Sequence, residues 1–190
     1  MPTVDAVAFE GLLVDLEAYA DEHDVPICRR DRGMFLYQLA KQHRPEHAVE
    51  IGAAIGYSTA LIARALAENG TGRITSIDIS PKAVAATRTT LARVGVADIA
   101  TVVEADGTTG LKQLTTPIDF LFLDADKPSY ITYFHAAEPL LTDGAVIVAD
   151  NVGRFPDQMA DYLAEVRRRF DSRTQIFPED KMEVSIYRKG

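Results

Sequence analysis

The chain has 190 residues, of which 47% are hydrophobic and 25% charged, a composition typical of a single globular domain. Lysine and arginine together number 20 against 28 aspartates and glutamates, and the net charge of −8 argues against a broad nucleic-acid-binding surface. The chain has 1 cysteine, Cys28, which excludes an intrachain disulfide and a cysteine-rich zinc site.

Two helices are predicted before the first strand. Apolar residues recur at helical spacing from about Thr3 to Glu22, which predicts an amphipathic helix. The polar stretch from Asp21 to Arg32 contains Pro26 and is predicted to be a loop. Asp31 is expected to cap a second helix, whose apolar positions are Phe35, Leu36 and Leu39.

From residue 47 onwards, short apolar runs alternate with helical patterns. Strands are predicted at 47–52, 73–79, 99–105, 118–124 and 145–150, and helices at 57–69, 81–94, 129–141 and 159–170. Two further strands, 173–177 and 183–188, are separated by a short loop, which predicts an antiparallel hairpin. The expected fold class is therefore α/β: a three-layer sandwich around a Rossmann-like, seven-stranded, mostly parallel sheet with an antiparallel terminal hairpin.

A glycine-containing turn follows the first strand. The segment VEIGAAIGYS places Gly52 and Gly56 between a buried strand and a helix, where backbone N–H groups can approach a ligand. A tight turn that only packs is the alternative, because G-x-x-x-G is not the dinucleotide fingerprint. Glu50 favours binding, since a carboxylate inside a buried strand is costly unless it is paired. Asp78, at the end of the second strand, is suited to ribose hydroxyls, so a nucleoside ligand is predicted.

Polar residues also follow the fourth and fifth strands. Asp124 ends one strand, and Asp150 with Asn151 ends the other. If these strands are parallel neighbours, the three side chains converge, because adjacent strands lie about 4.8 Å apart. Oxygen donors without histidine or cysteine suit a hard cation such as Mg²⁺. Lys127 is close enough to act there as a general base, although strand-end acids are often merely solvated.

At this point the chain resembles a known family. The segments VEIGAAIGYS, ITSIDIS, EADG, FLFLDADKPSY and AVIVADNV are similar, in order, to the motifs of the class I S-adenosylmethionine-dependent O-methyltransferases. The branch is the metal-dependent catechol and caffeoyl-CoA type, O-methyltransferase family 3. The resemblance covers residues 26 to 188, with 45–190 expected as the catalytic core. Residues 1–44 are then expected to contribute helices to the pocket and to dimer contacts.

The resemblance implies a role for each motif residue. Residues expected to contact S-adenosylmethionine are Cys28, Glu50, Gly52, Tyr57, Ser58, Asp78, Ala105, Asp106 and Asp124. Ligands expected for Mg²⁺, or for Mn²⁺ or Ca²⁺, are Asp124, Asp150 and Asn151. Lys127 is the expected catalytic base, and Lys127, Asn151 and Glu183 are expected to face the substrate. The short segment after Asn151 predicts an open acceptor site that tolerates several diols.

The predicted function is methylation of a vicinal-dihydroxy aromatic small molecule. Two alternatives are the same chemistry on a hydroxylated tRNA base, which the acidic charge disfavours, and a nicotinamide-dependent oxidoreductase, which leaves the strand-end residues unexplained. A homodimer is expected, and nucleic acid is not an expected partner. The N-terminal segment is interrupted by acidic residues and no apolar run reaches the ~20 residues of a membrane span, so a cytoplasmic protein is expected.

Overall fold

A computed structural model describes residues 4–190 and contains a seven-stranded sheet with the order β3-β2-β1-β4-β5-β7-β6. Its strands are β1 (His47–Ile51), β2 (Arg73–Asp78), β3 (Ala100–Glu104), β4 (Ile118–Leu123), β5 (Leu141–Ala149), β6 (Asp171–Ile176) and β7 (Lys181–Ile186). Strands β1 to β5 are parallel to one another, whereas β7 is antiparallel to both β5 and β6. The predicted sheet and its terminal hairpin are confirmed.

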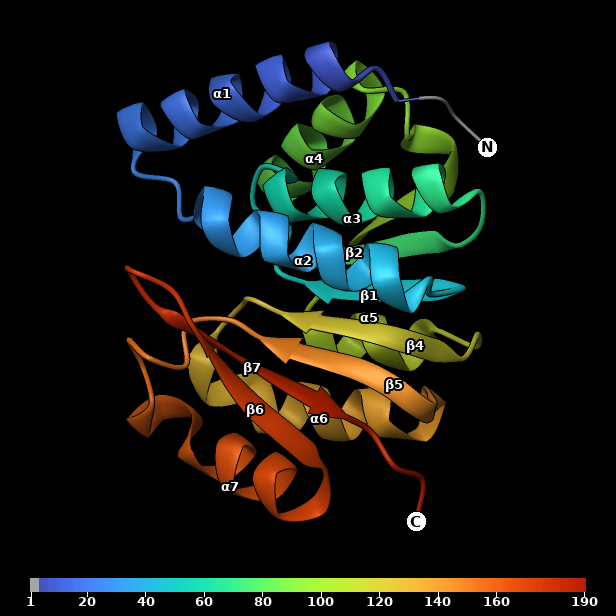
Figure 1. Cartoon of the computed structure of the whole chain (residues 1–190), viewed down its shortest axis with the longest axis vertical. Coiled ribbons are helices and arrows are strands. Elements are labelled where there is room, and N and C mark those ends of the chain that lie inside the picture. Colours follow the sequence, from blue (N-terminus) through green and yellow to red (C-terminus); the bar gives the residue numbers. More distant parts are fainter. Residues whose placement is uncertain (1–3) are drawn as a thin grey trace.

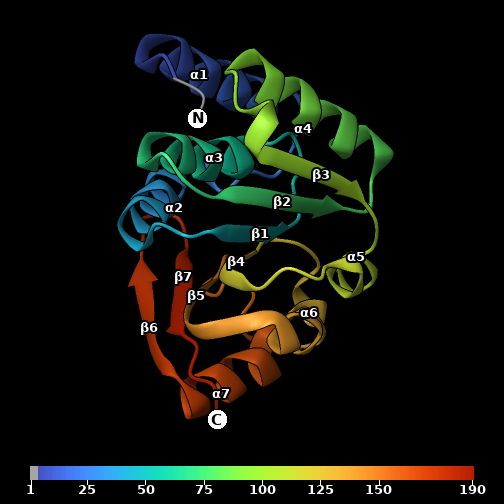
Figure 2. The same ribbon diagram turned by 90° about the vertical axis from the view of Figure 1, so that its right-hand side faces the viewer.

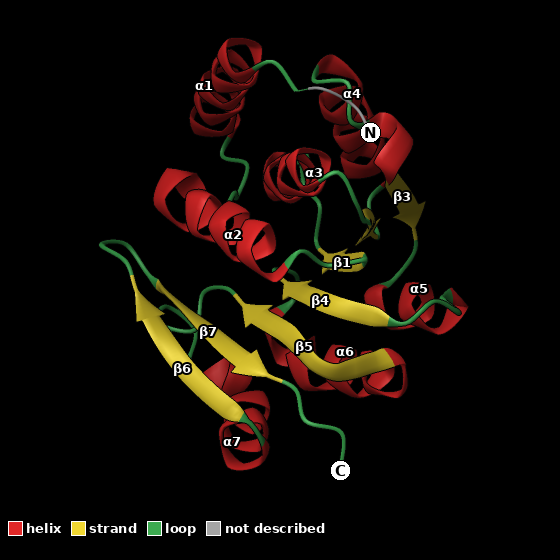
Figure 3. Ribbon diagram, turned by 45° about the vertical axis from the view of Figure 1, so that its right-hand side comes forward, coloured by secondary structure: helices red, strands yellow, loops and turns green. Residues whose placement is uncertain are grey.

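Helices cover both faces of the sheet. They are α1 (Ala6–His23), α2 (Arg29–His43), α3 (Tyr57–Asn69), α4 (Pro81–Arg93), α5 (Gly107–Gln113), α6 (Tyr130–Ala137) and α7 (Ala160–Arg169), and short 3₁₀ turns lie at Ala97–Ile99, Lys127–Ser129, Glu138–Leu140 and Asp157–Met159. The helices α2, α3 and α4 pack on one face, with α1 outside them (Figure 1). The other face carries α5, α6 and α7 (Figure 3).

The alternation of side chains along β4 explains the two apolar layers. Phe120 and Phe122 belong to the cluster under α2, α3 and α4, whereas Leu121 and Leu123 belong to the cluster under α5, α6 and α7. Successive strand side chains point to opposite faces of a sheet, so a central strand covered on both sides is apolar at every position. All four residues are fully buried.

The strand order creates a switch point beside β1. The chain proceeds from β1 outward to β2 and β3, then returns to β4 on the other side of β1, so that β3 and β6 form opposite edges of the sheet (Figure 2). Ligands of such sheets bind beyond the carboxyl ends of the strands at this point. The adjacency of β4 and β5 was a condition of the predicted site, and it is confirmed, with Leu123 opposite Ala149.

Local differences from the predicted elements have identifiable causes. Helix α2 begins at Arg29 with Cys28 at its N-cap, so the prediction that Asp31 caps it is wrong. The expected helix 129–141 is a 3₁₀ turn, α6 and a second 3₁₀ turn; Pro139 lacks the N–H that would continue α6. Helix α5 was not predicted, because it is short and contains two glycines. The predicted start of the first helix at Thr3 lies outside the described residues.

Ser80 caps α4 and Pro81 occupies its first turn, and Gly70 closes α3 in a left-handed conformation. Between residues 4 and 190, no helix is both long enough and apolar enough to cross a membrane.

Candidate active site

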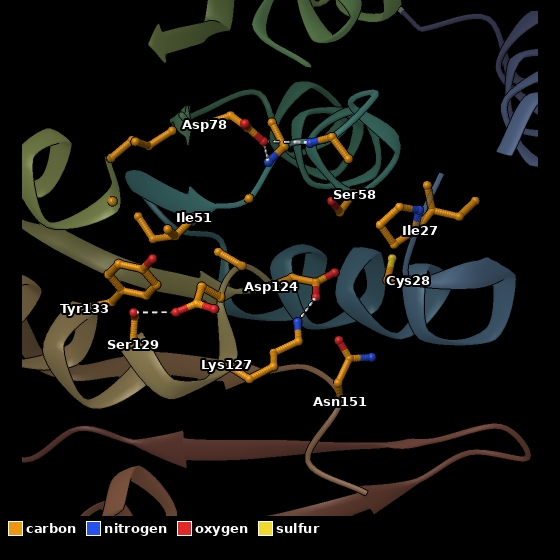
Figure 4. Close-up of a pocket in the computed structure, with 18 of the residues that line it drawn as sticks. Ile27, Cys28, Ile51, Ser58, Asp78, Asp124, Lys127, Ser129, Tyr133 and Asn151 are labelled. Carbon is orange, nitrogen blue, oxygen red and sulfur yellow. Dashed lines mark hydrogen bonds and ion pairs between the residues drawn. The ribbon is translucent and has the colours of Figure 1, made fainter. Parts of the chain in front are cut away.

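A cavity of about 760 Å³ lies at the carboxyl ends of β1, β2, β4 and β5, beside the start of α2. This volume is typical of a small-molecule site. Its lining includes Cys28, Arg32, Gly52, Tyr57, Ser58, Asp78, Ala105, Asp106, Asp124, Lys127, Asn151, Arg154, Phe155 and Glu179. In Figure 4, Asp78 lies at one end of the cavity, Asn151 at the other, and Asp124 between them.

The glycine turn forms one wall of the cavity. Gly52 has a φ of +97°, and a Cβ at this residue would lie 2.8 Å from the carbonyl carbon of Asp124, with the carbonyl oxygen closer still. Its N–H donates to the carbonyl oxygen of Ile77 at 2.9 Å. Only glycine fits where the end of β1 crosses so near the end of β4. The turn thus leaves backbone space that a nucleoside cofactor can occupy.

Asp78 holds the glycine turn in place while facing the cavity. Its Oδ2 accepts hydrogen bonds from the backbone N–H groups of Ala53 at 2.9 Å and Ala54 at 3.0 Å. The N–H of Ala105 donates to the Asp78 carbonyl oxygen, and the Asp106 carboxylate caps α5. These residues meet at the cavity as expected, and carboxylates in this position suit the hydroxyl and amino donors of a nucleoside.

Glu50 lies behind the lining of the cavity, and its expected contact with the cofactor stays a prediction. Its carboxylate is fully buried, is not part of the cavity lining, and accepts hydrogen bonds from three hydroxyls, those of Ser58 at 2.5 Å, Ser76 at 2.5 Å and Thr59. Burial raises the pKa of Glu50 to about 7, and the three hydroxyls oppose this rise. The buried carboxylate does need partners, but the protein supplies them. Glu50 therefore orients Ser58, which does line the cavity.

Cys28 and Tyr57 line the cavity from the α2 and α3 sides. Burial raises the pKa of the Cys28 thiol, and the charges of Asp150 and Asp124 add to the rise, so the thiol is held neutral. The Tyr57 hydroxyl donates to the Glu17 carboxylate of α1. The N-terminal helices are thus attached directly to the cavity wall.

Lys127 stands at the end of β4 with two polar partners. Its Nζ donates to Oδ1 of Asp124 at 2.8 Å and to the hydroxyl of Tyr130 at 3.0 Å, and the amine is mostly shielded from solvent (Figure 4). Tyr130 is fully buried, and burial raises the pKa of its hydroxyl well above the ordinary value. Tyr130 therefore holds the amine in the cavity as a neutral partner.

The residues after β5 form a second polar cluster around a buried arginine. Nη1 of Arg32 donates to Oδ1 and Oδ2 of Asp150 at 2.6 and 2.7 Å, and it lies 3.8 Å from Oδ2 of Asp180. Asn151 has a φ of +65°; its N–H donates to Asp150 at 2.7 Å and its side-chain nitrogen donates to Asp180 at 3.0 Å. Burial and the charge of Asp124 raise the pKa of Asp150, while Arg32 opposes the rise.

This cluster decides how well the expected metal ligands fit a divalent ion. Within residues 4–190, no group of three or more histidine, cysteine, aspartate and glutamate side chains could hold a metal ion, so a site would depend on two carboxylates and the Asn151 amide. Asp124 is paired with Lys127, and both oxygens of Asp150 accept from Arg32. Asp150 is fully buried, and Arg32 rather than Asp150 lines the cavity. The expected donor set does not fit a divalent ion in this arrangement.

Glu183 is not at the cavity, which corrects the expectation that it faces the substrate. It lies on β7 opposite Ala149, is nearly fully buried, and accepts from Nε and Nη2 of Arg167 at 2.7 and 2.9 Å. Thr174 donates to it at 2.6 Å. The carboxylate therefore joins β7 to α7 and β6. Glu179, in the β6–β7 loop, is the acidic residue of this hairpin that reaches the cavity.

Sequence reasoning missed the arginine and the tyrosine that complete the site. Arg32 was assigned to a polar loop, and nothing near it in the sequence indicates a partner at position 150. Tyr130 follows Lys127 by three residues, a spacing that places side chains on one face of a helical segment and could have identified it.

Comparisons with known proteins agree with this geometry. A family model described as O-methyltransferase matches residues 12–171. The chain is 37% identical over 128 residues to a catechol O-methyltransferase from Niastella koreensis, covering 65% of this chain and 57% of the relative. It is 35% identical over 162 residues to a catechol O-methyltransferase from Mycobacterium tuberculosis, covering 80% and 73%.

A solved structure supports the same assignment. The O-methyltransferase TomG from Streptomyces achromogenes, in complex with S-adenosylmethionine, matches with a TM-score of 0.79 at 26% identity, over 94% of this chain and 90% of that one. The match therefore covers 57% of the length of the N. koreensis relative and 90% of the TomG chain. From the family match, the identities and the fold together, the chain belongs to the O-methyltransferase family.

Proposed function

We propose that this protein transfers the methyl group of S-adenosylmethionine to one hydroxyl of a catechol-like aromatic small molecule. The observation that carries the proposal is the placement of the Lys127 amine in a cavity that also contains the glycine turn and Asp78. One end of the cavity suits a nucleoside cofactor, and the other offers a nitrogen base for an acceptor hydroxyl. Relatives named catechol O-methyltransferase support this acceptor class.

The proposed reaction is a direct transfer. When bound, S-adenosylmethionine supplies an electrophilic methyl group. The Nζ of Lys127 takes the proton from the acceptor hydroxyl. The acceptor oxygen forms a bond to the methyl carbon while the carbon–sulfur bond breaks, and the electron pair of that bond stays on sulfur. The proton then passes from Nζ to solvent. Holding the two reactants in line accounts for much of the expected acceleration.

A divalent metal ion is not part of this proposal, because both carboxylate oxygens of Asp150 accept hydrogen bonds from Arg32. The homodimer and the cytoplasmic location stay predictions. Family membership disfavours the nicotinamide-dependent oxidoreductase. The hydroxylated tRNA base remains an acceptor to be tested against small diols.

The proposal is tested by an acceptor screen with methyl-labelled S-adenosylmethionine. Caffeate, 3,4-dihydroxybenzoate, catechol and bulk tRNA are offered separately to the wild-type chain. We expect label in the diols and none in tRNA. Label in tRNA alone, or in no acceptor while the cofactor binds, would contradict the proposal.

The Lys127→Met variant tests the role of the base. We expect kcat to fall at least about 100-fold, since general-base catalysis contributes on that order. The dissociation constant of S-adenosylhomocysteine should change little, because the amine faces the acceptor end. Lys112→Met, at an exposed lysine of α5, is the matched control. Equal losses of kcat in both variants would show that charge removal, not base removal, is responsible.

A further inference from the structure

We infer that the guanidinium of Arg32, in place of a divalent metal ion, is the fixed positive charge that binds the acceptor's oxygens. This inference rests on the proposed function, and it names the group that recognises a vicinal diol. The Arg32 side chain of α2 donates to both oxygens of Asp150, the carboxylate that was expected to bind a metal ion.

Asp150 is already neutralised by Arg32 and does not line the cavity. Oδ1 accepts from both Arg32 Nη1 and the Asn151 N–H, and Oδ2 accepts from Arg32. Side-chain exposure is 3% for Arg32 and 0% for Asp150, so water does not compete for this pair. A metal ion bound by Asp150 would have to displace the guanidinium within a buried space, with like charges in contact.

The neighbouring carboxylate, that of Asp180, is held by other donors and makes no hydrogen bond to Arg32. Asp180 accepts from the backbone N–H groups of Gly153 at 3.0 Å and Arg154 at 2.9 Å, and from the Asn151 side chain. Its nearest oxygen is 3.8 Å from Arg32 Nη1. Asp180 therefore holds the chain after β5, and Asp150 is the partner that fixes the guanidinium.

Arg32 has N–H donors that no protein group within residues 4–190 accepts. Among the described residues, only Nη1 of its side chain donates to protein, so the two N–H groups of Nη2 remain for a ligand, whereas Nε is buried. Arg32 also lines the cavity together with Lys127. The two N–H groups of Nη2 can each donate to one of two adjacent oxygens, as a vicinal diol offers. The positive charge favours the ionised hydroxyl, and Lys127 takes the proton.

The first experiment asks whether the wild-type chain needs or binds metal. Enzyme stripped with EDTA is assayed on the best diol of the screen with and without added Mg²⁺, and Mn²⁺ binding is followed by electron paramagnetic resonance. We expect activity to change by less than about twofold and Mn²⁺ to bind no more tightly than on the order of 1 mM. Near-stoichiometric Mn²⁺ binding with activity lost on chelation and restored by metal would overturn the inference.

The second experiment removes the guanidinium. Arg32→Met should lower kcat/KM for the diol at least about 100-fold, leave S-adenosylhomocysteine affinity little changed, and bind Mn²⁺ at least about tenfold more tightly than wild type. Arg93→Met is the matched control, because Arg93 does not line the cavity and pairs with Asp15 at the surface. Unchanged kcat/KM in Arg32→Met would overturn the inference.

A third variant covers the event that Arg32→Met does not fold. Arg32→Lys keeps a charge beside Asp150 but loses the paired donors, and kcat/KM should fall about tenfold. Wild-type kcat/KM in this variant would remove the argument for a two-pronged contact. If no diol is methylated under any condition, the proposed function fails, whereas Mn²⁺ binding still decides whether Arg32 replaces the metal.

Discussion

Replacing Gly52 by alanine tests the crossing of β1 and β4 on which the cavity depends. At a φ of +97° any side chain is strained, which costs about 1–2 kcal/mol. The added Cβ would also lie 2.8 Å from the carbonyl carbon of Asp124 and 3.2 Å from Cα of Ala125, both of them backbone atoms. Overpacking of this kind costs a further ~1–3 kcal/mol, because a strand end must move.

The expected destabilisation of Gly52→Ala is therefore about 2–5 kcal/mol. For a chain of this length, each kcal/mol lowers Tm by about 2–4 °C. Gly70→Ala is the matched control, since Gly70 also has a positive φ of +72° but has nothing within 4 Å of the added Cβ. The expected loss of stability in Gly70→Ala comes from backbone strain alone and is about 1–2 kcal/mol. Thermal unfolding followed by circular dichroism measures both variants under the same conditions.

The two variants should also differ in cofactor binding. In Gly52→Ala the shifted Asp124 backbone narrows the cavity. The dissociation constant of S-adenosylhomocysteine, measured by calorimetry, should therefore rise at least about tenfold. Gly70 is at the far end of α3, and its variant should bind as wild type does. Equal Tm values for the two variants, with unchanged cofactor affinity in Gly52→Ala, would refute the close-crossing argument.

Two further predictions concern the buried carboxylates. In Glu50 the pKa is raised from 4.5 to about 7 by burial, so the native state retains a proton that the unfolded state loses, and stability falls as pH rises through this range. The free energy of unfolding of Glu50→Gln, measured in urea, should rise relative to that of wild type by about 2–3 kcal/mol as the pH goes from 5 to 8. A difference between the two proteins that does not depend on pH would contradict this account. Glu183→Gln should lower stability by about 1 kcal/mol because its contacts with Arg167 weaken. The KM for the diol should stay within about twofold, and a tenfold rise would return Glu183 to the substrate site.

The parallel core and its switch point could be predicted from the sequence because they depend on local patterns. The continuous apolar run in β4 requires cover on both faces, and the glycine turn and Ser80–Pro81 mark helix starts. The convergence of Asp124 and Asp150 also followed, since both end neighbouring parallel strands. These inferences need only the order of elements and the geometry of a sheet.

What the sequence could not supply was the partner of each charged side chain. Glu50 was expected to contact the cofactor, yet hydroxyls from α3 and β2 satisfy it. Glu183 lies one strand from the site, but its side chain is paired with Arg167 of α7. The direction and pairing of such groups depend on which helix packs over each strand end, and that is a property of tertiary structure rather than of spacing.

The pair formed by Arg32 and Asp150 also bears on when the site is assembled. Its two residues are 118 positions apart, one in the second helix and the other at the end of the fifth strand. During synthesis α2 emerges early, whereas its partner carboxylate follows only after most of the sheet has been made. Long-range contacts of this kind close late, after shorter loops have formed. We therefore expect the end of the cavity that contains Arg32 to be completed late in folding, after β5 has joined the sheet.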